Sequence, residues 1–255
     1  MVIVNSVNNE TIKRVASLSE KKYRKFYGTF IVEGYKLVNE VVCGAMEIEN
    51  LFVEASHLTK YSDLIAKCEP NVYLVSKAAF DKISDTVSSQ GIIAEVKMKP
   101  NFNFKIQEPM IVLDRISDPG NLGTIIRTAA ATGFHDIVLI NCTDPYNPKT
   151  VRSSSGGIFY TDLFLLTYEE FIEEAEKSHL KIYIADMNGE NIFKVSNLDE
   201  KYALVIGNEG AGVSKEFKEK ANRVLSLPMK SQMESLNAGV SASVLMYELK
   251  RSEFK

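Results

Sequence analysis

Three polar clusters in the second half of the sequence carry side chains that could bind a small molecule and act on it. The clusters are Asn121 with Arg127 after the turn DPG, Glu209 inside GNEGAG, and Ser235 with Asn237 inside ESLN. A guanidinium or an amide can stabilise negative charge that develops in a reaction, and a carboxylate can orient these groups or accept a proton. The clusters predict one polar cleft. A capped helix with a surface arginine is the alternative for the first of them.

The glycine-rich stretch GNEGAG at 207–212 allows the backbone to approach a ligand closely, but it differs from the known phosphate loops. It lacks the Lys-Ser/Thr ending of a P-loop, and it does not begin a dinucleotide-binding fingerprint. The carboxylate of Glu209 at its centre suits a neutral or cationic ligand better than a phosphate. A nucleotide-dependent oxidoreductase is therefore disfavoured.

Alternating apolar runs and helical patterns must position these clusters. Strands are predicted at 110–116, 136–141, 181–187, 202–208 and 223–229, and helices at 121–132, 168–178, 214–221 and 237–250. Apolar strands separated by helices predict a parallel sheet that is buried on both faces, with its sites at the carboxyl ends of the strands. Each polar cluster follows one of these strands, so we expect the three to line a single pocket.

The first hundred residues predict a smaller α/β domain. Helices are expected at 8–27, 34–42 and 76–86, and strands at 30–32, 48–54, 71–76 and 91–98. Residues 101–109 show no clear periodicity, and the stretch around them is rich in proline and asparagine. The expected organisation is therefore a domain over 1–100, a linker over 101–109 and a second domain over 110–255.

Composition excludes several classes of protein. The chain has 255 residues, a net charge of −3 and three scattered cysteines, which suits a globular protein with reduced thiols rather than a disulfide framework. No His, Cys, Asp or Glu set has the spacing of metal ligands, so no metal is expected. No signal peptide or membrane span is evident, and we expect a cytoplasmic protein.

Positive charge is concentrated at the N-terminus, where residues 1–25 hold six basic and two acidic side chains. This predicts either a phosphate-binding surface or a solvated helix face. The basic candidates are Lys21, Lys22, Arg24 and Lys25. The aromatic residues among them, Tyr23, Phe26 and Tyr27, belong either to a base-stacking surface or to the core.

Three sequence blocks resemble the SpoU/TrmH branch of the SPOUT methyltransferases. They are LDRISDPGNLGTIIRTAAATGFHDIVLI at 113–140, LVIGNEGAGVS at 204–214 and LPMKSQMESLNAGVSASVLMYEL at 227–249. NPKTVRSSSGGIF at 147–159 also matches, so the resemblance covers essentially all of 109–250. KKYRKFYGTFIVEGYKLVNEVV resembles the ribosomal-protein-like RNA-binding domain of ribosomal-RNA members of the family.

The resemblance implies transfer of a methyl group from S-adenosylmethionine to a ribose 2′-hydroxyl of RNA, with 23S ribosomal RNA as the expected substrate. It implies a deep C-terminal trefoil knot and a homodimer in which each site is completed by the partner chain. The implied catalytic residues are Asn121, Arg127, Glu209, Ser235 and Asn237. The implied cofactor-binding residues are Ile206, Gly207, Leu227, Met229 and Leu236, together with Ser235 and Asn237.

Several questions stay open at this point. The family mechanism makes Arg127 the proton acceptor, but a guanidinium seldom deprotonates, so Arg127 could instead stabilise the developing alkoxide. Glu209 is the alternative acceptor, or it orients Arg127 or Asn121. The chain also departs from the usual family run after ESLN, with Gly239 near the start of the last helix. Transfer RNA as the substrate, or a non-catalytic RNA-binding relative, are the alternative functions.

Overall fold

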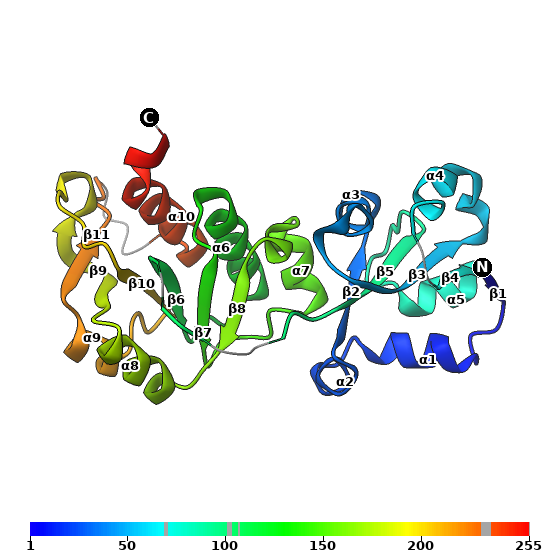
Figure 1. Ribbon diagram of the computed structural model, residues 1–255, viewed down its shortest axis with the longest axis horizontal. Helices are drawn as coiled ribbons and strands as arrows, with labels where there is room; N and C mark the ends of the chain where they lie inside the picture. Colours follow the sequence, from blue (N-terminus) through cyan, green and yellow to red (C-terminus); the bar gives the residue numbers. More distant parts are fainter. Residues whose placement is uncertain (69–70, 101–103, 107, 231–235, 255) are drawn as a thin grey trace. The chain divides into compact units, whose positions relative to one another are not determined.

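A computed structural model describes residues 1–255 except 69–70, 101–103, 107, 231–235 and 255 (Figure 1). The chain forms two compact units. The N-terminal unit contains Met1–Lys99 and Asp144–Phe159, and the C-terminal unit contains Pro100–Thr143 and Tyr160–Lys255. The chain therefore passes from one unit to the other three times, after Lys99, after Thr143 and after Phe159. The domain bounds expected from the sequence did not include this return of the chain.

The C-terminal unit is built on a six-stranded sheet in which all neighbouring strands are parallel, in the order β11-β9-β10-β6-β7-β8. The strands are β6 (Met110–Asp114), β7 (Asp136–Ile140), β8 (Asp162–Leu165), β9 (Lys181–Asn191), β10 (Tyr202–Gly207) and β11 (Arg223–Ser226). The parallel sheet predicted from the apolar runs is confirmed. Strand β8 was not predicted.

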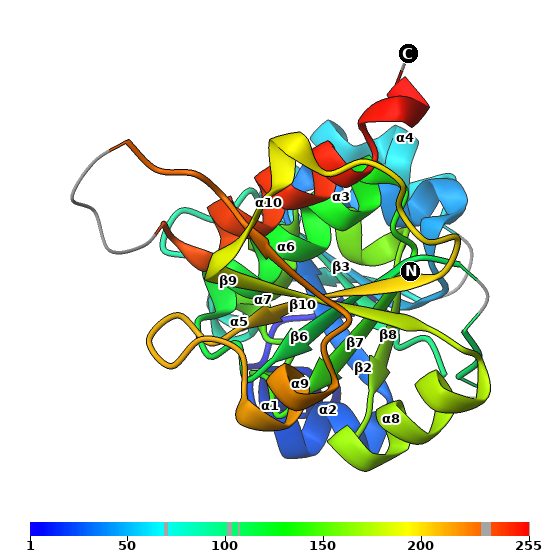
Figure 2. The same cartoon turned by 90° about the vertical axis from the view of Figure 1, so that its left-hand side faces the viewer.

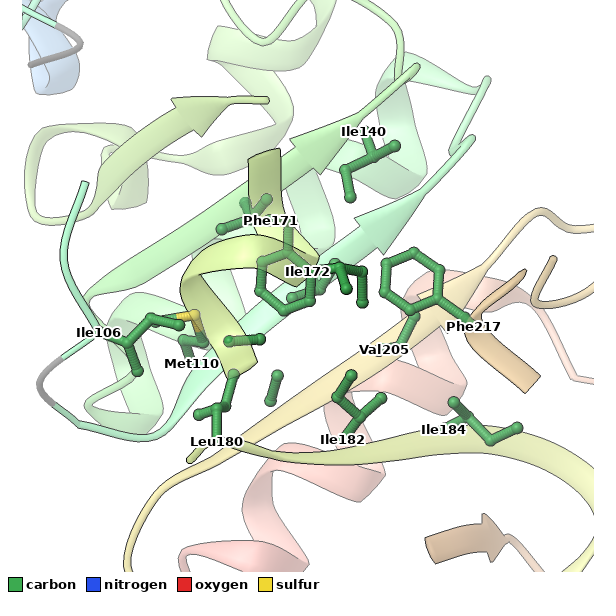
Figure 3. Packing of buried hydrophobic residues seen from close by; sticks show 14 of the residues in the cluster. Ile106, Met110, Ile140, Phe171, Ile172, Leu180, Ile182, Ile184, Val205 and Phe217 are labelled. Atoms are coloured by element: carbon green, nitrogen blue, oxygen red, sulfur yellow. The ribbon is translucent and has the colours of Figure 1, made fainter. Parts of the chain in front are cut away.

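Helices cover both faces of this sheet, as Figure 2 shows. They are α6 (Pro119–Thr132) and α10 (Ala238–Leu249) on one face, and α8 (Tyr168–Lys177) and α9 (Lys215–Lys220) on the other. Phe171 of α8 and Phe217 of α9 are fully buried against strand residues such as Val205 (Figure 3). Burial of apolar area on both faces explains why the strand sequences are continuously hydrophobic.

The N-terminal unit has a mixed five-stranded sheet in the order β1-β4-β3-β5-β2. Its strands are β1 (Val2–Val4), β2 (Thr29–Glu33), β3 (Ile48–Glu54), β4 (Val72–Val75) and β5 (Ile92–Lys97). Its helices are α1 (Glu10–Ser17), α2 (Lys21–Tyr27), α3 (Tyr35–Glu40), α4 (Ser62–Ile65), α5 (Lys77–Ile83) and α7 (Pro148–Ser154). The single helix predicted over 8–27 is wrong, because the chain turns at 18–20 between α1 and α2.

The segment Asp144–Phe159 is held in the N-terminal unit by charged and aromatic contacts. Asp144 accepts hydrogen bonds from Nε and Nη2 of Arg24, at 3.1 and 2.5 Å. Arg152 Nη1 lies 2.5 Å from Asp85 Oδ2. The ring centres of Phe30 and Tyr146 are 4.9 Å apart.

A buried carboxylate, Glu95 on β5, organises the centre of the N-terminal sheet. Arg14 donates to both of its oxygens at 2.6 and 2.7 Å, Thr29 Oγ1 donates at 2.8 Å and Asn50 Nδ2 at 2.6 Å. Burial alone would raise the pKa of Glu95, but the hydrogen bonds from Arg14, Asn50 and Thr29 outweigh it, so the pKa lies below its ordinary value of 4.5. Glu95 is therefore ionised in the folded protein at neutral pH.

Glu95→Gln is expected to lower the unfolding free energy by about 2 kcal/mol at pH 7, because Arg14 loses a charged hydrogen-bond partner. Since folding lowers the pKa, the stabilisation is complete above about pH 4.5 and is lost as the pH falls below that value. Urea unfolding from pH 3 to 7 should show a flatter profile for the variant. Glu47→Gln, which changes a carboxylate that is 69% exposed, is the control. Equal pH profiles for the two variants would contradict this role.

Candidate active site

A chain of hydrogen bonds joins three of the five predicted catalytic residues. Asn121 Nδ2 donates to Glu209 Oε1 at 2.8 Å, and Asn237 Nδ2 donates to Asn121 Oδ1 at 2.8 Å. Ser117 Oγ and Asn208 Nδ2 donate to Glu209 Oε2 at 3.3 and 3.2 Å. The ends of β6 and β10 and the start of α10 thus meet in one polar network, as the parallel sheet requires.

Local capping interactions place each member of this network. The side chain of Asp118 accepts a hydrogen bond from the backbone N–H of Asn121 at 2.8 Å, and this N-cap holds Asn121 in the first turn of α6. Asn237 is the N-cap of α10, and its Oδ1 accepts from the backbone N–H of Val240 at 3.2 Å. Asn121, in the first turn of α6, and Asn237, the N-cap of α10, are therefore fixed by the starts of these helices.

The loop after β10 is a closed turn that presents Glu209. Asn208 and Gly212 exchange backbone hydrogen bonds of 3.1 and 2.9 Å, and Asn208 Oδ1 accepts from the N–H groups of Gly210 and Ala211. A Cβ on Gly207 would lie 2.2 Å from backbone atoms of Gly212 and Val213, so the turn can close only on a glycine.

Glu209 has the electrostatics of an ionised hydrogen-bond acceptor. Burial would raise its pKa, but the hydrogen bond from Asn121, two backbone N–H groups and the hydroxyl of Ser117 together lower it. A carboxylate with a lowered pKa is a weak base, because efficient proton acceptors have pKa values near the working pH. The geometry favours Glu209 as a group that orients Asn121.

The small residues after ESLN let α10 pack closely on α6. A Cβ on Gly239 would lie 3.2 Å from the side chain of Thr124, and Ser243 Oγ lies 2.8 Å from Thr128 Oγ1. Ala242 is fully buried. The glycine that departs from the usual family run thus lies where α10 packs against Thr124 of α6.

A cavity of about 490 Å³ adjoins this network, and Glu209 lines it. The five predicted cofactor-lining residues other than Ser235 and Asn237 all face the same cavity: Ile206, Gly207, Leu227, Met229 and Leu236. A cavity of this size with aliphatic walls and exposed backbone groups suits a drug-sized ligand with a flat apolar part. The sequence did not predict that Asp186, Asn188 and Lys218 form a polar wall of this cavity. The turn-forming pair Asn188-Gly189 indicated a loop at this place in the sequence, but not its part in a binding site.

One predicted catalytic residue, Arg127, stands apart from the network. Arg127 lies on α6 with an exposed side chain, and no described residue forms a hydrogen bond or ion pair with it. Ser235 lies outside the described residues. In the described parts of the chain no group of three or more His, Cys, Asp or Glu side chains is placed to hold a metal ion.

The predicted RNA-binding residues divide into two kinds. Lys21, Lys22 and Lys25 are exposed on α2. Arg24 is buried, with its guanidinium bound to Asp144 and to the backbone carbonyl groups of Leu18 and Ser19. The prediction that Arg24 contacts RNA phosphate is therefore wrong, since its donors are used within the fold.

Two family profiles match the chain. The profile of the SpoU rRNA methylase family matches residues 108–247, and that of the MRM3-like substrate-binding domain matches residues 9–94. Among the residues that the structure describes, no helix is long and apolar enough to cross a lipid bilayer.

Full-length relatives are similar to this chain. The 23S rRNA (guanosine(2553)-2′-O)-methyltransferase RlmP of Bacillus subtilis is 31% identical over 97% of this chain and 98% of that protein. The 23S rRNA (adenosine(1067)-2′-O)-methyltransferase of Streptomyces laurentii is 25% identical over 96% of this chain and 93% of that protein.

A solved structure has the same fold as this chain and matches it over almost the whole length of both chains. The AdoMet-bound rRNA methyltransferase from Sinorhizobium meliloti superposes with a TM-score of 0.87 and 26% identity, over 98% of this chain and 97% of that chain. The profile covers more than half of the sequence, and the similarity to whole relatives extends across both units. The chain belongs to the SpoU rRNA methylase family.

Proposed function

We propose that this protein transfers a methyl group from S-adenosylmethionine to a ribose 2′-hydroxyl of 23S ribosomal RNA. The observation that carries the proposal is the Asn237–Asn121–Glu209 hydrogen-bond chain at the edge of the 490 Å³ cavity. The names of two full-length relatives support the substrate class. Because those names give different nucleotides, they do not transfer a target position to this chain.

The cavity fits S-adenosylmethionine in size and in chemistry. Leu227, Met229 and Leu236 offer an apolar surface for an adenine ring, and the backbone around Gly207 offers donors and acceptors for its edge. The Glu209 carboxylate at the rim suits a positively charged ligand. When bound, the cofactor supplies an electrophilic methyl group on a sulfonium centre. A relative crystallised with AdoMet supports this assignment.

The protein's own residues would mainly position and stabilise the attacking ribose oxygen. Asn121 and Asn237 hold each other in fixed orientation, and Glu209 keeps the amide of Asn121 in place. Arg127 would stabilise the developing alkoxide, which suits its permanent positive charge. Ser235, close to Asn237 in the sequence, would complete the site. Much of the rate would come from this alignment.

Gly207→Ala is expected to raise the Kd of S-adenosylmethionine at least about five-fold, because overpacking of this kind costs about 1–3 kcal/mol. The reason is the 2.2 Å approach of a Cβ to the backbone of Gly212 and Val213. Isothermal titration calorimetry would measure the change. Gly210→Ala is the matched control on the same loop, since its Cβ would meet only Asn208 Oδ1 at 3.7 Å. Equal affinity in both variants would place the cofactor elsewhere.

The N-terminal unit would dock the RNA. Changing Lys21, Lys22 and Lys25 together to alanine is expected to weaken RNA binding and to reduce the magnitude of its salt slope by about 2–3, because each phosphate contact contributes about 0.7–0.9. Filter binding at several salt concentrations would measure the slope. The control changes three exposed lysines of the C-terminal unit, Lys177, Lys215 and Lys220. An unchanged slope would show that the lysines of α2 do not contact the RNA and that the RNA binds to another surface.

Four finer features belong to the same proposal. They are a trefoil knot in the C-terminal unit, a ribosomal-protein-like fold for the N-terminal unit, a division of the sequence into 1–100, 101–109 and 110–255, and a cytoplasmic location. Family membership supports the first two features, and the bounds of the two profiles support the third, from which the packing of Asp144–Phe159 in the N-terminal unit departs. The three cysteines, none of them in a disulfide, support the last.

A homodimer is also part of the proposal, with α10 as the contact surface. Val240, Val244 and Tyr247 of this helix are exposed, although each is large and apolar. Phe193 and Phe254 extend the surface and line a groove of about 490 Å³ with Val244 and Tyr247. A partner chain there would bury these side chains, and it could bring further groups to the exposed Arg127 on the neighbouring α6.

Methyl transfer to RNA tests the proposed function. Purified protein would be incubated with tritiated S-adenosylmethionine and total RNA from cells that lack the enzyme, and the RNA would then be separated by class. Label in 23S rRNA is the expected result. Label in transfer RNA would overturn the substrate and keep the chemistry. Tight RNA binding without label would favour a non-catalytic RNA-binding protein.

A further inference from the structure

Helix α2 carries aromatic side chains on its outer surface. Phe26 is 79% exposed and Tyr27 is 39% exposed, while Tyr23 is half-buried. The possibility that these rings belong to the core of the N-terminal unit is therefore excluded for Phe26. Exposure of a single aromatic residue is common in proteins, but neighbouring exposed rings on one short helix need an explanation.

The exposed ring of Phe26 is not what attaches α2 to the N-terminal unit. Arg24 is the buried residue of this helix, and it donates to the carbonyl groups of Leu18 and Ser19 at 2.5 and 2.7 Å and to Asp144. The helix is thus anchored from its inner side by a polar residue. The rings on the outer side are left available for a ligand.

The rings are also ordered relative to one another. Tyr23 and Tyr27 are stacked with centroids 6.5 Å apart, and Phe26 meets Tyr27 edge-on at 4.9 Å. The guanidinium of Arg14 lies 5.3 Å from the centre of the Tyr27 ring, and Arg14 is itself fixed by Glu95. A surface that is already ordered loses less side-chain entropy when it binds.

Positive charge surrounds this aromatic surface. Lys21, Lys22 and Lys25 are exposed on the same helix, and the Lys22 ammonium lies 4.6 Å from the centre of the Tyr23 ring. An apolar protein partner would have to desolvate these lysines without compensation. Single-stranded nucleic acid satisfies both features, since its bases stack on aromatic rings and its phosphates contact cations.

We propose that Phe26 and Tyr27 form a stacking platform for unpaired bases of the RNA substrate, with Lys21 and Lys25 on the adjoining phosphates. This inference rests on the proposed function, and it specifies that the N-terminal unit recognises a loop or another single-stranded element rather than a plain duplex. Duplex RNA offers no free base faces to such a platform.

The absence of tryptophan from the sequence permits a direct test. Phe26→Trp introduces a single tryptophan that keeps the stacking surface and can be excited selectively, at wavelengths longer than those the eleven tyrosines absorb. Titration with a 12-nucleotide oligoadenylate should quench its emission, and a 12-base-pair RNA duplex should quench it far less. Val87→Trp is the control, because Val87 is a fully exposed apolar residue of the same unit. Equal quenching of both tryptophans, or none at Phe26→Trp, would overturn the platform.

Affinity measurements separate stacking from simple apolar contact. Phe26→Ala and Phe26→Leu should both weaken oligoadenylate binding about ten-fold, as expected for the loss of one base–aromatic contact, while Phe26→Trp retains it. If Phe26→Leu binds like the unaltered protein, stacking is wrong. If the emission of the Phe26→Trp variant changes with protein concentration alone, a second copy of the chain covers this surface and the platform is overturned.

The outcomes also separate this inference from the proposed function on which it rests. Methylation of 23S rRNA by the unaltered protein, without quenching in Phe26→Trp, would reject the platform and keep the proposed function. Quenching without methylation of any RNA would support the platform and reject the proposed function.

Discussion

Replacing Arg127 with alanine is expected to lower kcat by about 10²- to 10³-fold, which is the usual cost of removing a group that stabilises a developing oxyanion. The side chain is exposed, and no described residue engages it, so its loss should leave the fold and the cofactor cavity intact. The Kd of S-adenosylmethionine should therefore be unchanged. Single-turnover methylation and calorimetry would measure the two quantities separately.

The comparison variants for Arg127 identify its role. Arg127→Lys keeps the charge but loses the forked donor geometry, so partial activity is expected. Glu209→Gln should lower kcat less than Arg127→Ala if Glu209 only orients Asn121, since a glutamine oxygen can still accept that hydrogen bond. A rise in KM for RNA with kcat unchanged in Arg127→Ala would show that Arg127 serves binding and not the chemical step.

Replacing Arg24 with methionine is expected to destabilise the N-terminal unit by about 3–5 kcal/mol, the usual cost of removing one partner of a buried ion pair. Asp144 would keep a largely buried carboxylate without its guanidinium, and the carbonyl groups of Leu18 and Ser19 would lose their donor. Urea unfolding at pH 7 would measure the change.

Neighbouring substitutions provide the controls for Arg24. Lys25→Met removes an exposed charge one residue away and should change the unfolding free energy by about 0.5 kcal/mol at most. Arg24→Met combined with Asp144→Leu should recover part of the loss, because the unpaired carboxylate is then removed as well. Equal stability of Arg24→Met and Lys25→Met would contradict the anchoring role. Arg24 would then again be a candidate for contact with RNA phosphate.

The parallel sheet could be predicted because its strands are buried on both faces and read as continuous apolar runs. Tyr202–Gly207 is an example, since five of its six residues are buried and all six lie within the predicted strand. The meeting of Asn121, Glu209 and Asn237 followed from the same pattern, because each follows or begins an element at one sheet end. Residues at the carboxyl ends of parallel strands lie close together, and both the strands and their direction can be predicted from local sequence patterns and topology rules.

The remaining features depend on contacts between distant residues, which local patterns do not encode. Arg24 resembles its lysine neighbours in the sequence, yet its pairing with Asp144, 120 residues away, buries it. Asp144 also begins the segment Asp144–Phe159, which belongs to the N-terminal unit although parts of the C-terminal unit flank it in the sequence. The cavity wall at Asp186 and Lys218 likewise joins β9 to α9 through an ion pair of 2.9 Å.

The chemical position of the transferred methyl group tests the central claim most directly. RNA methylated by the purified protein with tritiated S-adenosylmethionine would be hydrolysed in alkali, and the products would be separated by size. The proposed reaction blocks the ribose hydroxyl that alkaline cleavage requires, so the label should appear in resistant dinucleotides. Label released entirely in mononucleotides would show methylation of a base, and it would contradict a ribose 2′-O-methyltransferase.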